Sequence, residues 1–174
     1  PDGESSYRVL YTDYYFITLP AGYVMTSMFV VFMLASDLSE EMKSIAIRDE
    51  LTGLLNRRGF TEYGERAFSA ARRNKTPLSV IMTDIDRFKF INDKFGHAAG
   101  DSALVHFSRL VSESRRKEDV IARVGGEEFA LLLPGTNLRD AMALADQLCS
   151  KIGSSPMDMT SVGLPMTSSF GVAA

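Results

Sequence analysis

Two acidic pairs in the sequence have the residue types and spacing of a divalent-metal site. Asp84 and Asp86 follow the apolar run 78–83, and Glu127 and Glu128 follow a pair of glycines in RVGGEEFALLLP. Carboxylates at close range raise one another's pKa unless a cation lies among them. Oxygen ligands without a His or Cys cluster favour Mg²⁺ or Mn²⁺ over zinc. The alternative is a solvent-exposed turn that carries acidic residues and binds nothing.

The glycine pair, Gly125 and Gly126, separates two short apolar runs and predicts a hairpin. Residues without a Cβ permit positive φ and allow a phosphate or a base to approach the backbone closely. We therefore expect both glycines to border a substrate.

The apolar pattern around these residues predicts an α+β domain. Period-two and continuous apolar runs indicate strands, and positions repeating at three and four residues indicate helices. The order is β-α-β-β-α-β, the ferredoxin-like arrangement of an antiparallel sheet with helices on one face. It places the strand of Asp84 beside the hairpin of Glu127. The predicted strands are 78–83, 120–124, 129–133 and one within 166–174, the helices lie around 103–111 and 138–152, and a further helix at about 52–73 continues from the preceding segment.

Composition excludes some classes of protein. The chain has 174 residues, is 45% hydrophobic and carries a formal net charge of −3. That charge provides no general attraction to a nucleic acid polymer, so a phosphate-bearing ligand requires a local site or a metal. The single Cys149 excludes an internal disulfide.

The N-terminal part predicts a membrane anchor. Residues 14–36 contain no charged side chain. A helix of this length can cross a bilayer core of roughly 30 Å. A long buried helix is the alternative. Arg8 is the only cation before this run, whereas four cations follow it closely: Lys43, Arg48, Arg57 and Arg58. By the positive-inside rule, this excess places the C-terminal part in the cytoplasm.

A helical linker follows, with apolar residues at intervals of three and four: Val31, Leu34, Leu38, Met42 and Ile45. The pattern fits either a coiled coil with a second copy of the chain or a lone amphipathic stalk. We divide the chain into an extramembrane segment (1–13), a transmembrane helix (14–36), a linker (37–50) and a soluble domain (51–174).

Three motifs together resemble the GGDEF family of diguanylate cyclases. They are DELTGLLNRRGF at 49–60, DIDRFKFINDKFGHAAGD at 84–101 and GGEEF at 125–129. The resemblance runs from about Asp49 to the C-terminus. It implies a palm-like ferredoxin core that condenses two GTP molecules into cyclic di-GMP and releases pyrophosphate, with one GTP from each subunit of a homodimer. Combined with the membrane segment, it implies the inner membrane of a bacterium.

The resemblance also assigns roles to the acidic residues. Asp84, through its carboxylate, and Ile85, through its carbonyl, would bind the metal together with Glu128. Glu127 would activate the ribose 3′-hydroxyl and contact a metal. Metals neutralise triphosphates and lower the pKa of a hydroxyl, while a carboxylate accepts its proton.

The substrate pocket follows from the same resemblance. Asn92 and Asp101 would read the guanine edge, since an amide and a carboxylate complement its carbonyl and N–H groups. His97 would lie in this pocket, or would only begin a helix. Lys89 would offset phosphate charge, or would be a solvated surface lysine.

A second family feature is RKED, at 116–119, with five residues between Asp119 and Gly125. Its register matches the RxxD site at which the family binds its product as an inhibitor, and a guanidinium grips phosphate or guanine bidentately. The resemblance therefore implies feedback inhibition through Arg116 and Asp119. A solvated run of charges is the alternative.

The chain also departs from the family pattern. It stops at Ala174, before the family's next helix and strand with their lysine and arginine, and it does not begin with Met. We expect a fragment of a longer protein rather than a weakened enzyme. Two other functions stay open: a non-catalytic module that binds GTP or cyclic di-GMP, and a palm enzyme that uses another nucleotide.

Overall fold

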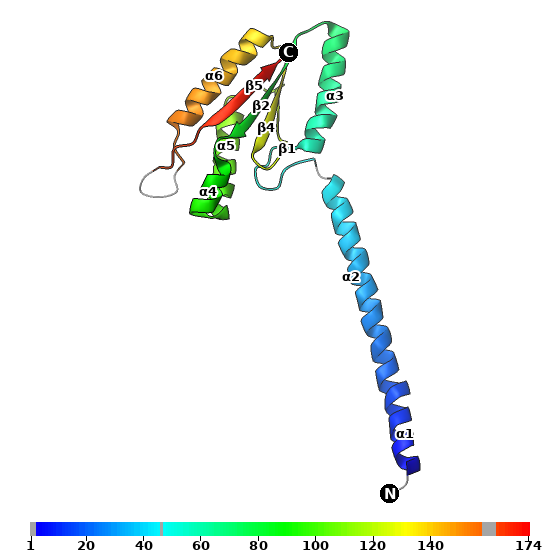
Figure 1. Cartoon of the computed structure of the whole chain (residues 1–174). Helices are drawn as coiled ribbons and strands as arrows, with labels where there is room; N and C mark the ends of the chain where they lie inside the picture. Colours follow the sequence, from blue (N-terminus) through cyan, green and yellow to red (C-terminus); the bar gives the residue numbers. More distant parts are fainter. Residues whose placement is uncertain (1–2, 46, 158–162) are drawn as a thin grey trace. The chain divides into compact units, whose positions relative to one another are not determined.

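The computed structural model describes residues 3–45, 47–157 and 163–174. The chain divides into two compact units, Pro1–Ala46 and Ile47–Ala174 (Figure 1).

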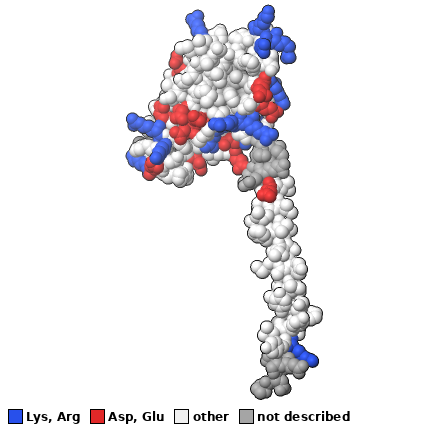
Figure 2. All heavy atoms as spheres, turned by 45° about the vertical axis from the view of Figure 1, so that its right-hand side comes forward, with Lys and Arg blue, Asp and Glu red and all other residues white. Residues whose placement is uncertain are grey.

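The first unit consists of helices α1 (Gly3–Asp13) and α2 (Leu19–Ile45), joined by a π-helical turn at Tyr14–Thr18. The wider turn precedes Pro20, whose ring would clash with the carbonyl four residues earlier in a regular helix. Residues Tyr7–Leu38 are long and apolar enough to cross a membrane, with a mean hydropathy of 1.8. Figure 2 shows this segment as almost free of charged side chains. The predicted span 14–36 lies inside it.

Hydroxyl groups within the apolar helix bond back to its own carbonyls. Thr26 Oγ1 donates to the Gly22 carbonyl at 3.0 Å, and Ser27 Oγ donates to the Tyr23 carbonyl at 2.8 Å. Such bonds satisfy polar side chains without water. The hydroxyls therefore do not oppose an apolar environment.

The second unit contains one five-stranded sheet in the order β1-β3-β4-β2-β5. Its strands are β1 (Leu55–Asn56), β2 (Leu78–Ile85), β3 (Val120–Arg123), β4 (Glu128–Pro134) and β5 (Ser168–Ala173). The β2–β4, β2–β5 and β3–β4 pairs are antiparallel, and the edge pair β1–β3 is parallel. The predicted ferredoxin-like order is confirmed, with β1 as an addition.

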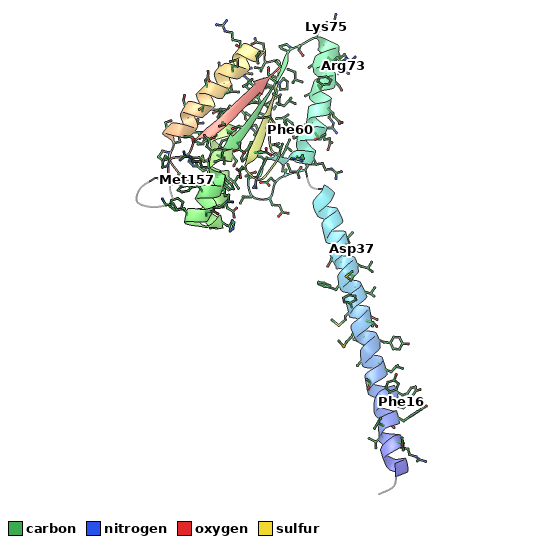
Figure 3. All side chains as sticks on the ribbon, in the orientation of Figure 1. Phe16, Asp37, Phe60, Arg73, Lys75 and Met157 are labelled. Atoms are coloured by element: carbon green, nitrogen blue, oxygen red, sulfur yellow. The ribbon has the colours of Figure 1, made fainter. Side chains whose placement is uncertain are left out.

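Helices α5 (His97–Ser112) and α6 (Leu138–Ser154) contribute to the main hydrophobic core on one face of the sheet. The rings of Phe107 and Phe129 pack there with centroids 4.5 Å apart. A short helix α4 (Phe88–Phe95), which the sequence pattern did not predict, precedes α5 and buries Phe88 and Ile91. Met157 lies just beyond α6 (Figure 3) and is buried in the same core.

Helix α3 (Arg57–Asn74) begins later than the predicted helix at 52–73. Residues 50–52 form a turn instead, and Gly53 follows with φ of +70°. The helix starts where the Asn56 side chain accepts a hydrogen bond from the Gly59 N–H at 3.0 Å, a regular N-cap. The expectation that this helix continues directly from the preceding segment was therefore wrong.

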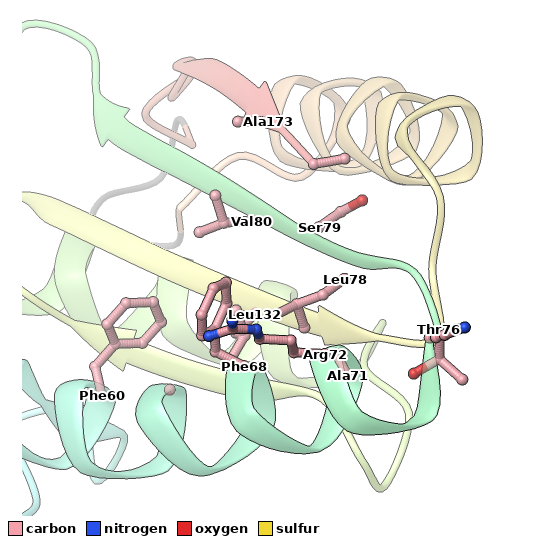
Figure 4. Close-up of a pocket in the computed structure, with 13 residues that line it drawn as sticks. Phe60, Phe68, Ala71, Arg72, Thr76, Leu78, Ser79, Val80, Leu132 and Ala173 are labelled. Atoms are coloured by element: carbon pink, nitrogen blue, oxygen red, sulfur yellow. The ribbon is translucent and has the colours of Figure 1, made fainter.

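Helix α3 lies against the sheet face that α5 and α6 leave open. Phe60 and Phe68 point from α3 toward Val80 and Leu132, which are paired on β2 and β4 (Figure 4). These neighbours of the core residues Ile81 and Leu131 face the opposite side of the sheet because strand side chains alternate. They line an apolar groove of about 680 Å³.

Candidate active site

The antiparallel register of β2 and β4 brings the two acidic motifs together. Asp84 is the Cα partner of Glu128. One position further along, the Ile85 N–H donates to the Glu127 carbonyl at 3.3 Å. The sheet therefore places Asp84, Ile85, Glu127 and Glu128 together along the edge formed by the ends of the interior strands β2 and β4, as predicted from the order of the strands.

The carboxylates at this edge disfavour one another's ionised form. Burial raises the pKa of Asp84, and repulsion from Glu128 and then Asp86 raises it further. Burial likewise raises the pKa of Glu127, with added repulsion from Asp84 and Glu128. Among the described residues, no donor hydrogen-bonds to the carboxylates of Asp84, Glu127 or Glu128. The edge is a site of uncompensated negative charge.

Asp86 differs from its neighbours because it has a partner. The Ser169 hydroxyl donates to Asp86 Oδ1 at 2.7 Å, which ties the end of β2 to the edge strand β5. Arg87 follows with φ of +58°, a left-handed conformation that is uncommon for arginine. This turn redirects the chain from β2 into α4.

The glycine turn is closed by the backbone. The N–H groups of Val124 and Gly125 donate to the Glu128 carbonyl at 2.9 Å and 3.3 Å. A Cβ at Gly125 would overlap the Glu128 carboxylate, whereas a Cβ at Gly126 would meet open space. Neither glycine uses the positive φ that the residue type permits, since the described glycines with positive φ are Gly53, Gly96 and Gly135. The Glu128 side chain thus occupies the space that a Cβ at Gly125 would fill.

Arg123 holds the same turn from the end of β3. Its guanidinium donates to the Gly126 carbonyl from Nε at 3.1 Å and from Nη2 at 2.7 Å. Nη1 also forms an ion pair with Asp49 Oδ2 at 3.2 Å. Arg57 Nε adds a bond to the Val124 carbonyl at 2.9 Å. Sequence reasoning missed these supports, although Asp49 and Arg57 lie inside one of the quoted motifs.

Asp49 anchors the other end of this network. Burial alone would raise its pKa, but hydrogen bonds from Thr52 and the charge of Arg123 lower the pKa overall. The Thr52 N–H and hydroxyl donate to Asp49 Oδ1 at 2.9 Å and 2.6 Å. The first segment of the domain is thus fixed to the turn that carries Glu127.

The predicted guanine readers lie near each other. A Cβ at Gly100 would overlap Asn92 Oδ1, so the Asn92 amide packs directly on the α5 backbone beside Asp101. Asp101 also lines a hollow of about 470 Å³ together with Leu51, a residue that sequence reasoning did not single out. Only the packing of the folded chain reveals that Gly100 contacts Asn92 and that Leu51 lines the hollow.

The remaining predicted substrate residues are exposed. His97 is the first residue of α5, and Lys89 lies on α4. Their positions are compatible with solvent-facing roles as well as with the predicted ones.

The donor set fits Mg²⁺ or Mn²⁺ only in part. Within the described ranges, no group of three or more His, Cys, Asp or Glu side chains converges closely enough to hold a metal ion. Mg²⁺, however, is usually bound by one or two carboxylates, with substrate phosphates and waters completing its shell. The Asp84–Glu128 pair and the Ile85 carbonyl are an oxygen set of that kind.

The RKED segment forms a turn at the opposite end of β3 from the glycine turn. The Arg116 N–H donates to Asp119 Oδ2 at 2.7 Å, and the Asp119 N–H donates to the Arg116 carbonyl at 3.3 Å. Burial raises the pKa of Asp119, while the bond from Arg116 opposes the rise. Arg116 is exposed and, with Asp119, lines a hollow of about 410 Å³.

Comparison with known proteins identifies the family. The model for "Diguanylate cyclase, GGDEF domain" matches residues 46–174, and the chain belongs to this family. It is 41% identical to diguanylate cyclase DgcM of Escherichia coli K12 over an alignment of 140 residues that covers 78% of this chain and 32% of that protein. The chain spans between 20% and 37% of the length of the first curated relatives that it matches.

Solved structures share the fold. The active GGEEF domain of a diguanylate cyclase from Vibrio cholerae is 36% identical, with a TM-score of 0.63 over 68% of this chain and 75% of that one. The GGDEF domain of DgcB from Caulobacter crescentus, solved in complex with c-di-GMP, is 28% identical. Its TM-score is 0.69 over 72% of this chain and 73% of that one.

Proposed function

We propose that the second unit is a diguanylate cyclase that condenses two GTP molecules into cyclic di-GMP and releases pyrophosphate. The observation that carries the proposal is the pairing of Asp84 with Glu128 beside Glu127, on a turn that Arg123 and Asp49 hold in place. Family membership and the active GGEEF domain of Vibrio cholerae support it.

Glu127 is the proposed general base for the ribose 3′-hydroxyl. Its raised pKa makes it a stronger base than an ordinary glutamate, and general base catalysis is most effective when the pKa approaches the working pH. Its backbone is held by the Ile85 N–H. Glu127 therefore combines a fixed position with increased basicity.

Asp84, Glu128 and the Ile85 carbonyl are the proposed ligands of Mg²⁺ or Mn²⁺. Such an ion neutralises triphosphate charge and lowers the pKa of the attacking hydroxyl. The chain's own contribution is to keep these oxygens together despite their repulsion, because the β2–β4 ladder fixes their separation. Gly125 leaves the space that the Glu128 side chain occupies.

The substrate is held, in this proposal, by Asn92 and Asp101 at the guanine edge, with His97 and Lys89 nearby. The packing of Asn92 on Gly100 supports this, because it limits the orientations of the amide. The backbone of Gly125 and Gly126 borders the phosphates. Each domain presents one GTP, so the reaction requires a homodimer.

Arg116 and Asp119 are proposed to bind cyclic di-GMP as an inhibitor. The structure of a related domain with c-di-GMP shows that the relative binds this nucleotide. Here the exposed guanidinium and the fixed Asp119 carboxylate border the same hollow.

We further propose that residues 14–36 anchor the protein in the bacterial inner membrane, with 1–13 outside, 37–50 as a linker and the domain from 51 onward in the cytoplasm. The apolar helix Tyr7–Leu38 supports the anchor. Dimerisation through α2 would bring two domains together.

The test is to incubate the full-length protein with GTP and Mg²⁺ and to separate the nucleotides by chromatography beside a Glu127→Ala variant. Cyclic di-GMP and pyrophosphate from the first sample alone would support the proposal. If folded, dimeric protein forms no product, a regulatory module that binds GTP or cyclic di-GMP becomes the better explanation.

A further inference from the structure

Helix α4 exposes two aromatic rings that take no part in the proposed reaction. Phe90 is 55% exposed and Phe95 is 40% exposed, whereas Phe88 and Ile91 of the same helix are buried. An α-helix has about 3.6 residues per turn, so Phe90 lies on the side of α4 that faces away from the core. Packing within the domain therefore does not account for these two rings.

Cations accompany the rings. Lys94 Nζ lies 5.3 Å from the centroid of the Phe90 ring and 5.1 Å from the centroid of the Phe95 ring. Arg87, just before the helix, is exposed as well, and within the described residues neither Arg87 nor Lys94 forms an ion pair. We call Arg87, Phe90, Lys94 and Phe95 the α4 patch.

The stretch that carries the α4 patch is locally cationic in an acidic chain. Positions 87–95 hold three cations and a single acid, Asp93, whereas the whole chain has a formal net charge of −3. Positive charge beside exposed apolar rings favours a partner that is both apolar and negatively charged. An uncharged apolar partner would leave the charge of Arg87 and Lys94 without compensation.

The interface of an anionic bilayer has this chemistry. Apolar and aromatic side chains enter the boundary between headgroups and acyl chains, while lysine and arginine keep their charges at the level of the phosphates. Each cation held near an anionic leaflet strengthens the attraction severalfold. The acids of the glycine turn oppose such a contact, so it has to come from the outer side of α4.

The α4 patch lies at the end of the sheet where the chain enters the domain. Helix α4 follows the end of β2 that carries Asp84, and the glycine turn is at the same end because β2 and β4 are antiparallel. The entering segment is fixed there by the ion pair of Asp49 with Arg123. A tether from the proposed membrane anchor therefore attaches at the patch end of the domain.

The outer side of α4 is separate from the predicted guanine reader. Phe90 and Asn92 are two positions apart, which places them on opposite sides of the helix. Asn92 packs on Gly100 of α5. A contact through Phe90 thus leaves the amide of Asn92 where it is.

We propose that the α4 patch docks on the anionic lipid surface of the membrane that anchors the chain. Phe90 and Phe95 enter the interface, and Arg87 and Lys94 contact lipid phosphates. The contact orients the domain against the bilayer and requires no GTP. It rests on the membrane anchor proposed above but not on cyclase activity.

The test uses a tryptophan as a reporter, because the chain contains none. Phe90→Trp keeps an aromatic ring in the patch, and the full chain is reconstituted in nanodiscs of phosphatidylcholine with or without phosphatidylglycerol. The lipids are brominated in the upper part of their acyl chains. We expect the emission to shift to shorter wavelength and to be quenched in the anionic discs. Met142→Trp, at an exposed position of α6, is the matched control and should show neither change.

Charge variants of the reporter chain test the cations. Arg87→Gln/Lys94→Gln should reduce the quenching severalfold, whereas Lys94→Arg keeps the charge and should retain it. The matched pair Arg73→Gln/Arg139→Gln removes two exposed cations outside the patch and should leave the quenching unchanged. Thermal melting of all these variants should stay near that of the reporter chain. High salt should weaken the quenching.

The outcomes separate this proposal from the anchor on which it rests. A chain that does not co-elute with the discs contradicts the anchor and the docking together. A chain that co-elutes without quenching in anionic discs overturns the docking alone, as does quenching that ignores lipid charge or the Arg87→Gln/Lys94→Gln change. A shifted emission without quenching that requires two chains per disc would assign the patch to a second copy. None of these readouts depends on cyclic di-GMP formation.

Discussion

The two turns at the ends of β3 differ in whether their acidic side chains accept hydrogen bonds. At the glycine turn, Glu127 and Glu128 face Asp84 with raised pKa values at Asp84 and Glu127, and among the described residues their carboxylates accept no hydrogen bond. At the RKED turn, Asp119 caps its own turn by accepting the Arg116 N–H. The carboxylates at the glycine turn repel one another, whereas the RKED turn satisfies most of its polar groups by hydrogen bonds within the turn.

This difference indicates what each turn is suited to bind. Repulsion between carboxylates is relieved by a cation, so the glycine turn is suited to a metal and its phosphate-bearing substrate. The RKED turn needs no cation for its structure and exposes the guanidinium of Arg116, a group suited to an anion. Neighbouring turns on one strand can therefore serve ligands of opposite charge.

The largest expected effect follows from removing one charge of the repelling pair. Asp84→Asn should reduce cyclic di-GMP formation by about 10²-fold to 10³-fold, the scale of losing a group that stabilises the transition state. Its melting temperature should not fall, because the substitution relieves repulsion. Chromatography of the product and thermal denaturation measure both, with the exposed Asp93→Asn as a matched control. A large loss of stability would contradict this account of the turn.

The next effect concerns the support of the glycine turn. Arg123→Ala should lower the free energy of unfolding by about 2–3 kcal/mol, because it removes the ion pair of Asp49 and leaves the Gly126 carbonyl without its donor. The Asp49–Arg123 pair is only partly exposed, so its contribution should exceed that of a surface pair. Urea denaturation measures the change. Arg66→Ala removes an exposed pair with Glu62 and should cost less than about 1 kcal/mol; equal losses would show that the network adds nothing.

Metal dependence of stability sharpens the same contrast. Near neutral pH, Mg²⁺ at ten times its Kd should stabilise the folded domain by about 1.4 kcal/mol, observed as a rise in melting temperature. The folded pKa values of Asp84 and Glu127 are raised, so stability without metal falls as pH rises from their ordinary values of 3.8 and 4.5 through the raised ones. Below those ordinary values the carboxyls are protonated and the Mg²⁺ effect should vanish. An equal Mg²⁺ effect at pH 3 and pH 7 would place the metal elsewhere.

The smallest expected effect is at the self-capped turn. Asp119→Asn keeps an acceptor for the Arg116 N–H and removes a buried charge, so the free energy of unfolding at neutral pH should change by less than about 1 kcal/mol. Asp119→Ala also removes the acceptor and should be the less stable of the two. Denaturant titration of both variants decides this, and an Asn variant as unstable as the Ala variant would show that the charge itself holds the turn.

The elements with strong periodicity were predictable from sequence. Strands β2, β3 and β4 and helices α5 and α6 bury continuous or helically spaced apolar residues, and their order implied the sheet that joins Asp84 to Glu128. Strand β1 was not predictable, because it has two residues at an edge. Helix α4 was missed because it is short and buries only Phe88 and Ile91.

The candidate site divides in the same way. Its acids could be recognised because charged residues beside apolar strands stand out in a sequence. Its supports could not, since Arg123 and Asp49 are 74 positions apart and nothing local to either residue indicates the other. The start of α3 was misplaced for a related reason: the turn before it is held by the Asp49 side chain rather than by backbone propensity. The packing of Asn92 on Gly100 depends on the angle between two helices, which a sequence does not express.

The long separation between Asp49 and Arg123 also sets when the site takes shape. On the ribosome, Asp49 and Asp84 emerge long before Arg123 and the glycine turn that follows it, so the ion pair forms only after synthesis has passed Arg123. Contacts between distant segments form late because chain entropy must first be overcome. The site therefore acquires the geometry for chemistry only after the first and middle segments of the domain have joined.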